Sequence, residues 1–476
     1  MNSEFRTGPG PKGHYDLAVV GAGSAGFSAA ITAAEAGARV ALIGQGTLGG
    51  TCVNVGCVPS KALIRAAEAV HHANTASRFS GVEAAGRVAD WNALRRQKDE
   101  LVTALRQSKY VDLLPAYSGV TYLEGRARLD DRGVTVDGQR LRAEKTIIAT
   151  GSHEFVPELP GLGSVPYLTS TTAFELEKLP QSLLIVGGGY IGCELAQMFA
   201  RAGVKVTLLF RSRLLPQAEP EIGAALAGYL SQDGVVVQPV EKYESVHATG
   251  PGVDLAVTID GEAAILQAQS LLLSAGRRAN TEGLGLDEAG VALSANRGIE
   301  VDDRMRTTKS GTYAAGDVTG QDLFVYMAAY GAKIAASNAL NGDGLVYDKI
   351  AMPAVVFTDP QVASVGLTEA AARKRGIDVR TSILALDNLP RAQAARDTRG
   401  LIKLVAEGSS KKLLGAHILA PEGADSIQTA ALALRQGLTY SDLAEMIFPY
   451  LTTVEGLKLA AQTFETDVSK LSCCAG

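Results

Sequence analysis

Two glycine-rich turns, each placed directly after a short apolar run, constrain this chain more than any other feature. Residues 21–26 (GAGSAG) follow the run at 16–20, and residues 187–192 (GGGYIG) follow the run at 183–186. A helical pattern and a second apolar run come after each turn, which is the order of a β–turn–α–β unit. Glycines in such a turn let the backbone approach a diphosphate, to which the helix start offers free N–H groups. The sequence therefore predicts an α/β protein with two dinucleotide-binding units.

Size and composition narrow the class further. The chain has 476 residues, which is room for about three domains. Its 45 basic and 50 acidic residues give a net charge of −5 without a basic tract, so a nucleic-acid partner is not expected. Residues 17–34 carry no charge, but their glycines and serines favour a strand, a turn and a helix over a membrane span. Residues 1–13 contain no apolar signal segment and are expected to form a disordered tail.

The remaining pattern predicts a coarse order of elements. Helices are expected at 24–36 and 190–202, second strands at 39–43 and 205–210, and mostly helical structure at 61–116. A β-rich stretch at 120–142 and a strand at 146–149 follow, and strands at 253–259 and 265–274 are expected to close the second unit. A strand end at 311–318 precedes a helix from about residue 324. The last third mixes expected strands (354–357, 379–386, 400–406, 413–419) with expected helices (423–436, 440–447, 454–464).

The segment GGTCVNVGCVPSK carries the strongest chemical signal. Cys52 and Cys57 are five positions apart, and in a regular helix this spacing separates two residues by about 7.5 Å along the axis and turns them to different sides. Such residues are beyond disulfide reach, so the sulfurs meet only if the segment is an irregular turn, for which Gly56 and Pro59 provide the freedom and the interruption. A helix start after the turn, helped by Lys61, would lower the pKa of a thiol. The alternative is a pair of small buried cysteines.

The residues at the end of each second strand depart from the usual dinucleotide pattern. An acidic residue there normally binds a ribose hydroxyl. The first unit has Gly44 and Gln45 instead, with Gln45 as a neutral candidate for this contact. The second unit has Arg211 and Arg213, whose guanidinium groups suit a 2′-phosphate and favour NADPH over NADH, a solvated surface pair being the alternative.

The other cysteines and the histidines add smaller signals. Five cysteines, an odd number, argue against a disulfide framework and for a reducing, cytoplasmic compartment. Cys473 and Cys474 are adjacent near the end of the chain, where soft thiolates suit a soft metal ion, the alternative being an accidental tail. Cys193 is expected in the core. The six histidines show no metal-binding spacing, and His71 and His72 are expected on an exposed helix face.

Together these motifs resemble the flavin-dependent pyridine nucleotide–disulfide oxidoreductase family from about residue 14 onward. GGTCVNVGCVPSK is similar to the redox-active disulfide motif of the family, Thr150-Gly151 to its ATG turn, and Tyr313–Asp317 to its second FAD motif. Within the family, the terminal LSCCAG and the segments 352–360 and 448–459 are most similar to the mercuric reductase branch. The N-terminal heavy-metal-associated domain that many members of this branch carry is not expected here.

The resemblance implies a glutathione-reductase-like fold with two Rossmann-like domains and an α+β dimerisation domain. It places an FAD-binding domain at 14–160, continued by 281–348, an NADPH-binding domain at 161–280 and a dimerisation domain at 349–476. FAD and NADPH are the cofactors implied. Their contacts are expected from Gly21, Gly23, Gly26, Gly49, Thr51, Lys61, Thr150, Gly151, Asp317, Gly187, Gly189, Gly192, Arg211, Arg213 and Gly276.

The resemblance also implies roles for catalytic residues. Cys57 is expected to be the flavin-proximal thiolate and Cys52 the interchange thiol. Lys61 and Glu194 are expected to form an ion pair near the flavin, with Tyr190 gating the nicotinamide pocket. Hg(II) would be captured from thiol complexes by Cys473 and Cys474 and then bound by the inner pair, Cys52 and Cys57.

One position distinguishes two branches of the family. Where glutathione and lipoamide-type reductases carry a catalytic histidine in a shared motif with glutamate, this chain has Tyr450 followed by Glu455. A phenol with a pKa near 10 is a poor proton shuttle at neutral pH, so reduction of Hg(II) is favoured over reduction of an organic disulfide. Tyr450, Glu455 and the tail are expected to act at the partner subunit's site, which implies an obligate homodimer. A flavoprotein disulfide reductase and a non-catalytic thiol protein that sequesters metal remain the alternatives.

Overall fold

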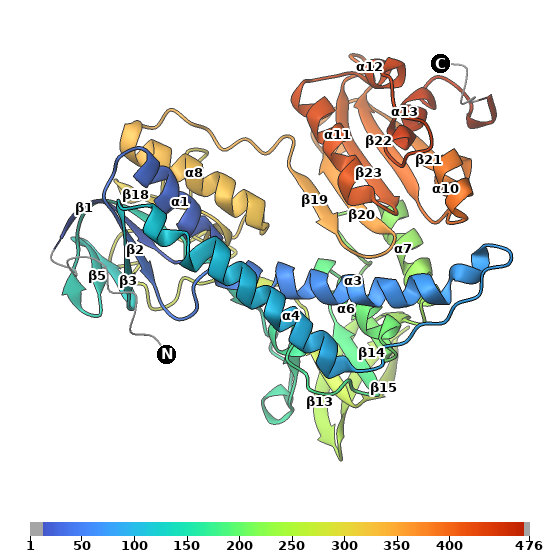
Figure 1. The fold of residues 1–476 in the computed structure, drawn as a ribbon, viewed down its shortest axis with the longest axis horizontal. Helices are drawn as coiled ribbons and strands as arrows, with labels where there is room; N and C mark the ends of the chain where they lie inside the picture. Colours follow the sequence, from blue (N-terminus) through green and yellow to red (C-terminus); the bar gives the residue numbers. More distant parts are fainter. Residues whose placement is uncertain (1–12, 471–476) are drawn as a thin grey trace. The chain divides into compact units, whose positions relative to one another are not determined.

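The computed structural model describes residues 13–470, which form two compact units. The first contains the described residues up to Ala62 together with Arg95–Phe155 and Gly276–Asp348. The second contains Leu63–Leu94, Val156–Ala275 and the described residues from Lys349 onward. Figure 1 shows the elements of both units. The division into three domains at residues 160, 280 and 348 stays a prediction, and the expected N-terminal tail lies outside the described residues except for Gly13.

A five-stranded parallel sheet forms the centre of the first unit. Its order is β18-β7-β1-β2-β3, which is the strand order of a dinucleotide-binding fold. The strands are β1 (His14–Val20), β2 (Val40–Gly44), β3 (Val120–Glu124), β7 (Arg142–Ile148) and β18 (Thr312–Ala314). Helices α1 (Ser24–Glu35) and α8 (Val325–Asn341) pack together on one face of this sheet (Figure 1). The small antiparallel sheet of β4 (Ala127–Asp130), β5 (Gly133–Val136) and β6 (Gln139–Arg140) packs on the other.

The helical region after the first unit's second strand is interrupted. It contains α2 (Gly50–Asn54), α3 (Cys57–Asn74) and α4 (Trp91–Arg106), with short turns η1 (Ala76–Arg78), η2 (Gln107–Val111) and η3 (Leu114–Ala116). Residues 79–90 are not helical, so the prediction of mostly helical structure throughout 61–116 was too broad. Gly81 (φ 83°) and Gly86 lower the helix propensity of this stretch. The remaining pair of strands, β8 (Ser152–Glu154) and β17 (Arg277–Ala279), is antiparallel.

The second unit contains another parallel sheet, ordered β12-β11-β10-β16-β9. Its strands are β9 (Leu168–Thr169), β10 (Ser182–Val186), β11 (Lys205–Phe210), β12 (Val236–Pro239) and β16 (Ser270–Leu273). The helices beside it are α5 (Ser170–Ala173), α6 (Tyr190–Arg201) and α7 (Pro220–Gln232), after the turn η4 (Leu162–Ser164). The two predicted β–turn–α–β units are therefore confirmed.

The expected closure of this sheet by 253–259 and 265–274 was wrong for most of those residues. β13 (Lys242–Thr249), β14 (Gly252–Ile259) and β15 (Glu262–Ala268) form a separate antiparallel sheet, and only β16 joins the parallel one. The physical reason is the burial pattern. Side chains along β14 alternate between buried and partly exposed, as in a sheet covered on one face, whereas Leu271–Leu273 are all buried.

The last third of the chain forms a five-stranded antiparallel sheet covered by helices. The order is β19-β20-β23-β22-β21, with strands β19 (Pro353–Val356), β20 (Gln361–Gly366), β21 (Val379–Ala385), β22 (Leu401–Glu407) and β23 (Leu413–Ala420). The helices are α9 (Glu369–Lys374), α10 (Pro390–Ala395), α11 (Gly423–Arg435), α12 (Tyr440–Glu445) and α13 (Glu455–Gln462). The short turns of the chain not yet named are η5 (Asp317–Thr319), η6 (Leu386–Asn388) and η7 (Val468–Lys470). The strands and helices predicted here are confirmed within a few residues, and β20, α9 and α10 were missed.

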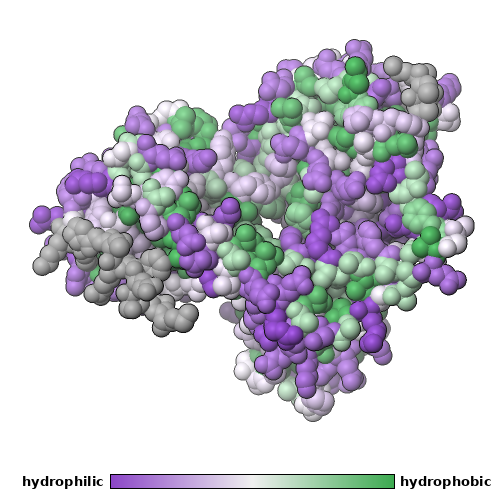
Figure 2. Space-filling view, viewed as in Figure 1, coloured by the Kyte–Doolittle hydropathy of each residue, from purple (hydrophilic) through white to green (hydrophobic). Residues whose placement is uncertain are grey.

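The surface of the described chain mixes polar and apolar side chains. Figure 2 shows apolar (green) side chains among polar (purple) ones over the region of α11 and α12. Ile447, just after α12, is 96% exposed, and Tyr450 and Leu451 are exposed beside it. Within residues 13–470, no helix has both the length and the apolar character needed to cross a membrane.

Candidate active site

The first glycine turn joins β1 to α1 and leaves the helix start open. Gly23 is the N-cap of α1, and neither a side-chain cap nor an acidic residue occupies the first turn. Position 26 requires glycine, because a Cβ there would lie 1.7 Å from the carbonyl oxygen of Gly21. The N–H groups of the first turn therefore stay available for a diphosphate, which suits the contacts predicted for Gly21, Gly23 and Gly26.

Asp317 lies beside this turn. The preceding Gly316 has φ 79° and lies so close to α1 that a Cβ on it would be 3.0 Å from the Cβ of Ala25. Ser152 Oγ donates a hydrogen bond to Asp317 Oδ2 at 2.6 Å, and Arg277 Nε donates to Ser152 Oγ at 2.8 Å. These contacts hold the carboxylate of Asp317 in place. Ser152 and Arg277 were not among the predicted site residues, and the signal that could have pointed to them is their position directly after the predicted site glycines 151 and 276.

Gly151 and Gly276 directly precede β8 and β17, the antiparallel pair of strands in the first unit. Gly151 (φ 72°) accepts a hydrogen bond from Asn280 N at 2.9 Å, and Thr150 Oγ1 donates to Asn280 O at 2.8 Å. Gly276 (φ 121°) accepts from Phe155 N at 2.9 Å. The turn predicted at Thr150 and Gly151 is thus held by backbone contacts that only the folded chain provides.

Cys52 and Cys57 belong to different helices. Cys52 lies in α2, which ends at Asn54, and Cys57 is the first residue of α3. Val55 (φ −139°, ψ 5°) interrupts the helical backbone between them. The structure therefore confirms the irregular turn that the spacing of the two cysteines requires.

Pro59 has a different role from the one predicted. It is the third residue of α3, where a missing N–H leaves no helical hydrogen bond unmade, so it starts the helix and does not interrupt the turn. Gly56 lies against the preceding helix, because a Cβ on it would be 3.0 Å from the Thr51 carbonyl oxygen. Gly49, with φ 96°, is the left-handed N-cap of α2. Thr51 and Gly49 thus shape the turn that carries Cys52.

The two thiols have different environments. Cys57 is exposed at the start of an 18-residue helix, whereas Cys52 is partly buried. The hydrogen bond with Cys57 and burial both raise the pKa of Cys52, while the charge of Lys61 acts in the opposite direction. The dipole of α3 favours an anion at its first residue. Cys57 is therefore the better site for a thiolate.

The second glycine turn repeats the geometry of the first. Gly189 is the N-cap of α6 without a side-chain cap, and a Cβ at Gly192 would lie 1.8 Å from the Gly187 carbonyl oxygen. Tyr190 begins α6, and burial raises its pKa. Glu194 is buried and accepts a hydrogen bond from Phe357 N at 2.8 Å. The pairing of Glu194 with Lys61 stays a prediction.

Arg211 and Arg213 follow β11 at the position where an acidic residue would bind a ribose. Arg211 is exposed, and no hydrogen bond or ion pair within the described residues engages its guanidinium group. Arg213 Nη2 donates to the carbonyl oxygen of Pro216 at 2.5 Å, while its buried Nη1 has no partner among the described residues. Free guanidinium N–H groups at a strand end suit a phosphate.

Tyr450 lies on the segment between α12 and α13, and Glu455 is the first residue of α13. Tyr450 is exposed, whereas Glu455 is buried at the start of α13 and accepts a hydrogen bond from Leu451 N at 3.1 Å. Burial raises the pKa of Glu455. Tyr450 is thus accessible to a second chain.

Of the remaining cysteines, one lies within the described residues and two lie outside them. Cys193 is fully buried in the core around α6, as predicted. Cys473 and Cys474 lie outside the described residues.

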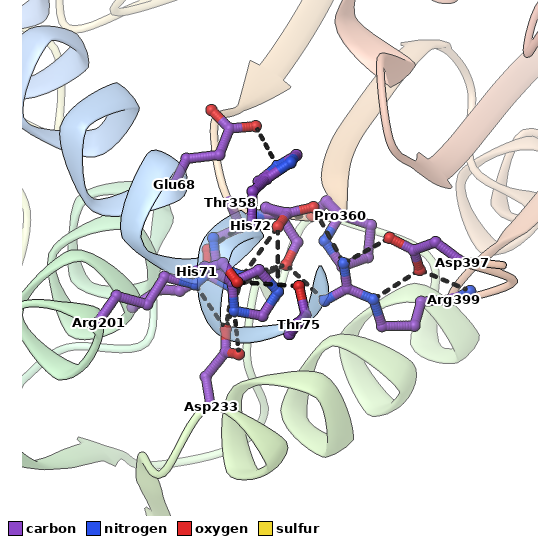
Figure 3. A network of polar contacts seen from close by, with 12 residues as sticks. Glu68, His71, His72, Thr75, Arg201, Asp233, Thr358, Pro360, Asp397 and Arg399 are labelled. Atoms are coloured by element: carbon purple, nitrogen blue, oxygen red, sulfur yellow. Dashed lines mark hydrogen bonds and ion pairs between the residues drawn. The ribbon is translucent and has the colours of Figure 1, made fainter. Parts of the chain in front are cut away.

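His71 is not on an exposed helix face, so that prediction was wrong. Its Nδ1 lies 3.3 Å from Asp233 Oδ1 and its Nε2 3.8 Å from Asp359 Oδ2 (Figure 3). Arg201 pairs with both of these aspartates. His72, its neighbour in sequence, is exposed as predicted. The difference arises because α3 presents His71 toward other elements of the second unit, which the sequence pattern of the helix does not reveal.

These features fit a protein that binds two dinucleotides and carries a redox-active dithiol. Each glycine turn is a cradle that a Cβ would fill, and each opens a helix without a capping side chain. The sequence of the whole chain agrees with this class. Residues 15–340 match the pyridine nucleotide-disulphide oxidoreductase family, and residues 352–461 match the dimerisation domain of that family. The chain belongs to this family, which implies a flavin and a pyridine nucleotide as cofactors and a homodimer as the assembly.

Several relatives share nearly the full length of the chain. Mercuric reductase of Streptomyces lividans is 47% identical, with 97% of this chain and 98% of the relative covered. Mercuric reductase of Staphylococcus aureus is 45% identical over 98% of this chain and 85% of its own length. Among solved structures, the Cu(II) complex of the HOCl-induced flavoprotein disulfide reductase RclA from Escherichia coli has a TM-score of 0.83 at 31% identity, covering 95% of this chain and 100% of that one. The predicted glutathione-reductase-like fold class is confirmed.

Proposed function

We propose that this protein is a mercury(II) reductase, which reduces Hg(II) to Hg(0) with two electrons from NADPH. The observation that carries the proposal is the Cys52–Cys57 dithiol at the start of α3, in a chain 45–47% identical to mercuric reductases over nearly its full length. The balanced reaction consumes one Hg(II) and one NADPH and yields Hg(0), NADP⁺ and one proton.

The dithiol suits the substrate. Hg(II) is a soft ion that prefers thiolate ligands. Cys52, the interchange thiol, is proposed to bind the ion first, and Cys57, favoured as thiolate by the helix dipole and next to the proposed flavin, displaces the remaining thiol ligand. The positive charge of Lys61 partly opposes the hydrogen bond with Cys57 and the burial, which together raise the pKa of Cys52. Uncharged Hg(0) has little affinity for thiolates and leaves.

FAD is the flavin proposed, held at the α1 start by Gly21, Gly23 and Gly26 and by the carboxylate of Asp317. When bound, it would pass the hydride electrons of the nicotinamide to the dithiol or to the metal ion. Thr150, Gly151, Gly49, Thr51 and Gly276 shape the surrounding turns and are the further contacts proposed.

NADPH is proposed at the second glycine turn. Gly187, Gly189 and Gly192 expose the start of α6, and Arg211 and Arg213 offer unengaged guanidinium N–H groups for the 2′-phosphate. Tyr190 begins α6 and is proposed to cover the nicotinamide site, and the buried carboxylate of Glu194 to pair with Lys61 near the flavin.

The partner subunit is proposed to complete the site. Tyr450 is exposed on an apolar segment of the dimerisation domain, with the buried Glu455 close by in sequence. A phenol near pKa 10 exchanges protons poorly at neutral pH but can approach a metal ion held by thiolates. Cys473 and Cys474 are proposed to take Hg(II) from thiol complexes and pass it inward, in a reducing cytoplasm.

The test follows NADPH absorbance after Hg(II) is added with excess thiol, with glutathione disulfide and NADH as parallel arms. Rapid oxidation of NADPH that depends on Hg(II), weaker oxidation of NADH and little response to the disulfide are expected. Cys57→Ser should abolish mercury turnover. Glutathione disulfide turnover without mercury turnover would refute the proposal and support a disulfide reductase, the second candidate, which the fold similarity to RclA favours.

A separate experiment tests the role proposed for Cys473 and Cys474. Replacing Cys473 and Cys474 together with serine should slow turnover of bulky mercury–thiol complexes more than turnover of small ones. An equal effect on both would contradict the transfer role.

A further inference from the structure

The FAD site proposed above lacks the acidic residue that usually ends the second strand of such a fold. β2 ends at Gly44, at the carboxyl edge of the sheet where dinucleotides bind. The hydroxyls of the adenosine ribose are therefore without their usual carboxylate on β2. The neighbouring strand β3 offers a replacement.

Space, and not backbone strain, explains why position 44 is glycine. A Cβ on Gly44 would lie 2.7 Å from the Cβ of Ala22 and 2.9 Å from the hydroxyl oxygen of Tyr122. Tyr122 belongs to β3 and pairs in register with Leu42, two residues before Gly44. Its ring packs with the core on the α1 side of the sheet. The phenol thus occupies the start of the path that a longer side chain at position 44 would take.

Glu124 lies at the equivalent level on β3. It pairs in register with Gly44, and the next residue, Gly125, donates its N–H to the carbonyl oxygen of Gly44 at 2.9 Å. Side chains alternate along a strand, so Glu124 and Tyr122 share the face of the sheet that carries α1 and the glycine turn. Burial raises the pKa of Tyr122, and the negative charge of Glu124 adds to this rise, which agrees with the placement of Glu124 near the phenol.

The carboxylate of Glu124 is not used elsewhere in the described structure. It is exposed, and no cation or hydrogen-bond donor among residues 13–470 engages it. β3 is the edge strand next to β2, so a ligand at the carboxyl edge of β2 is also within reach of β3. An acidic side chain with free acceptor oxygens is the chemistry that recognises a ribose diol.

We propose that Glu124 replaces the missing acid at position 44 and accepts a hydrogen bond from the 2′-hydroxyl of the adenosine ribose of FAD. Tyr122 is the positioning residue, because its phenol excludes a side chain from position 44. The inference rests on the proposed FAD binding. It assigns the ribose contact to the edge strand and not to Gln45.

The test is competition between FAD and the analogue whose adenosine ribose lacks the 2′-hydroxyl, measured by equilibrium dialysis of the full-length holoprotein. A hydrogen bond to a charged group contributes about 1.5–3 kcal/mol, which corresponds to tenfold or more in affinity. The unaltered protein should therefore bind FAD at least about tenfold more tightly than the analogue. Glu124→Ala, which removes the acceptor oxygens, should weaken FAD binding by about the same factor and reduce the preference for FAD over the analogue to within about twofold.

Two matched variants complete the design. Glu35→Ala removes an exposed carboxylate at the far end of α1 and should leave both affinities unchanged. Gln45→Ala should also leave them unchanged, and a loss of preference in that variant would overturn the assignment. A Glu124→Ala protein that retains the full preference would overturn it as well. An unaltered protein that binds no FAD would instead refute the proposed function.

Discussion

Cys57 joins two properties that its neighbour Cys52 lacks, namely exposure and a place at a helix start. Both properties act on the same quantity, the fraction of thiolate at neutral pH. The hydrogen bond to Cys57 and burial both raise the pKa of Cys52 and so lower its fraction of thiolate. The two cysteines thus differ in their expected fraction of thiolate because the turn at Val55 places them in different environments.

This difference predicts selective alkylation. In the reduced protein at pH 7, from which the flavin has been removed so that it covers neither thiol, a limiting amount of iodoacetamide should label Cys57 at least about tenfold faster than Cys52, because the thiolate is the reacting species. Mass spectrometry of the digested protein measures both sites. Cys193, fully buried, is the internal control and should stay unlabelled. Faster labelling of Cys52 would contradict the assignment of the thiolate to Cys57.

Among the elements of the second unit, a buried ion cluster joins α7 to the sheet of the dimerisation domain. Lys403 on β22 is 1% exposed, and its Nζ lies 3.1 Å from Glu219, 2.9 Å from Glu221 and 2.9 Å from Glu369. Glu219 also accepts from the backbone N–H of Glu369 at 2.6 Å. One lysine therefore compensates several carboxylates at the starts of α7 and α9.

Removing this lysine should be costly. Lys403→Met leaves the buried carboxylate of Glu219 without its lysine, although Glu369 keeps its pairing with Arg373, and breaking a buried pair in this way costs about 3–5 kcal/mol. Urea unfolding followed by circular dichroism measures the loss as a lower midpoint. Lys411→Met, at an exposed lysine 3.7 Å from Glu465, is the control and should cost less than about 1 kcal/mol. Equal midpoints for the two variants would show that the cluster adds no stability.

The ion network around α3 has a pH dependence whose sign follows from its charges. Burial and the cations Arg201 and Arg399 lower the pKa of His71, although Asp233 and Asp359 act in the opposite direction. The unfolded chain, with a histidine pKa near 6.5, takes up the proton first as the pH falls. Stability contributed by neutral His71 is therefore present above about pH 6.5 and is lost below it.

The exposed neighbour His72 provides a matched control for a test of His71. Between pH 7 and pH 5, His71→Gln should flatten the fall in unfolding free energy by up to about 1.4 kcal/mol per pH unit, measured by urea unfolding at each pH. His72→Gln, at the exposed neighbour, should leave the slope unchanged. A steeper fall in His71→Gln would mean that the folded protein holds His71 protonated.

For the molecule as a whole, the exposed apolar side chains of the dimerisation domain are the surface that we expect a second copy to cover. Ile447 is 96% exposed, and Met446, Tyr450 and Leu451 are exposed next to it. An apolar group of this kind is costly in water and is typical of an interface. It also carries Tyr450, so loss of the dimer should remove Tyr450 from the partner's site.

Ile447→Glu should therefore weaken the dimer. A charge in the apolar contact should raise the dimer dissociation constant by at least about tenfold, measured by sedimentation velocity over a concentration series. Ile265→Glu alters a 65% exposed isoleucine on β15, outside the dimerisation domain, and is the control expected to remain dimeric. Mercury turnover should fall with the dimer fraction in Ile447→Glu.

The two dinucleotide-binding units, the family and the irregular turn between Cys52 and Cys57 follow from the amino-acid sequence alone. These features depend on local constraints, since Gly26 must pack against Gly21 and Gly192 against Gly187 only a few residues away. The spacing of the cysteines is a local constraint as well, because a regular helix through both residues would keep their sulfurs apart.

Three other features could be determined only from the tertiary structure, namely which strands share a sheet, which histidine is buried and what lies beside Gly44. β14 and β15 lie outside the parallel sheet, and His71 contacts Asp233. Tyr122 and Glu124 lie beside the end of β2. His71 and Asp233, and likewise Gly44 and Glu124, are tens of residues or more apart in the chain. Their contact depends on how whole elements pack, and no local pattern of side chains encodes it.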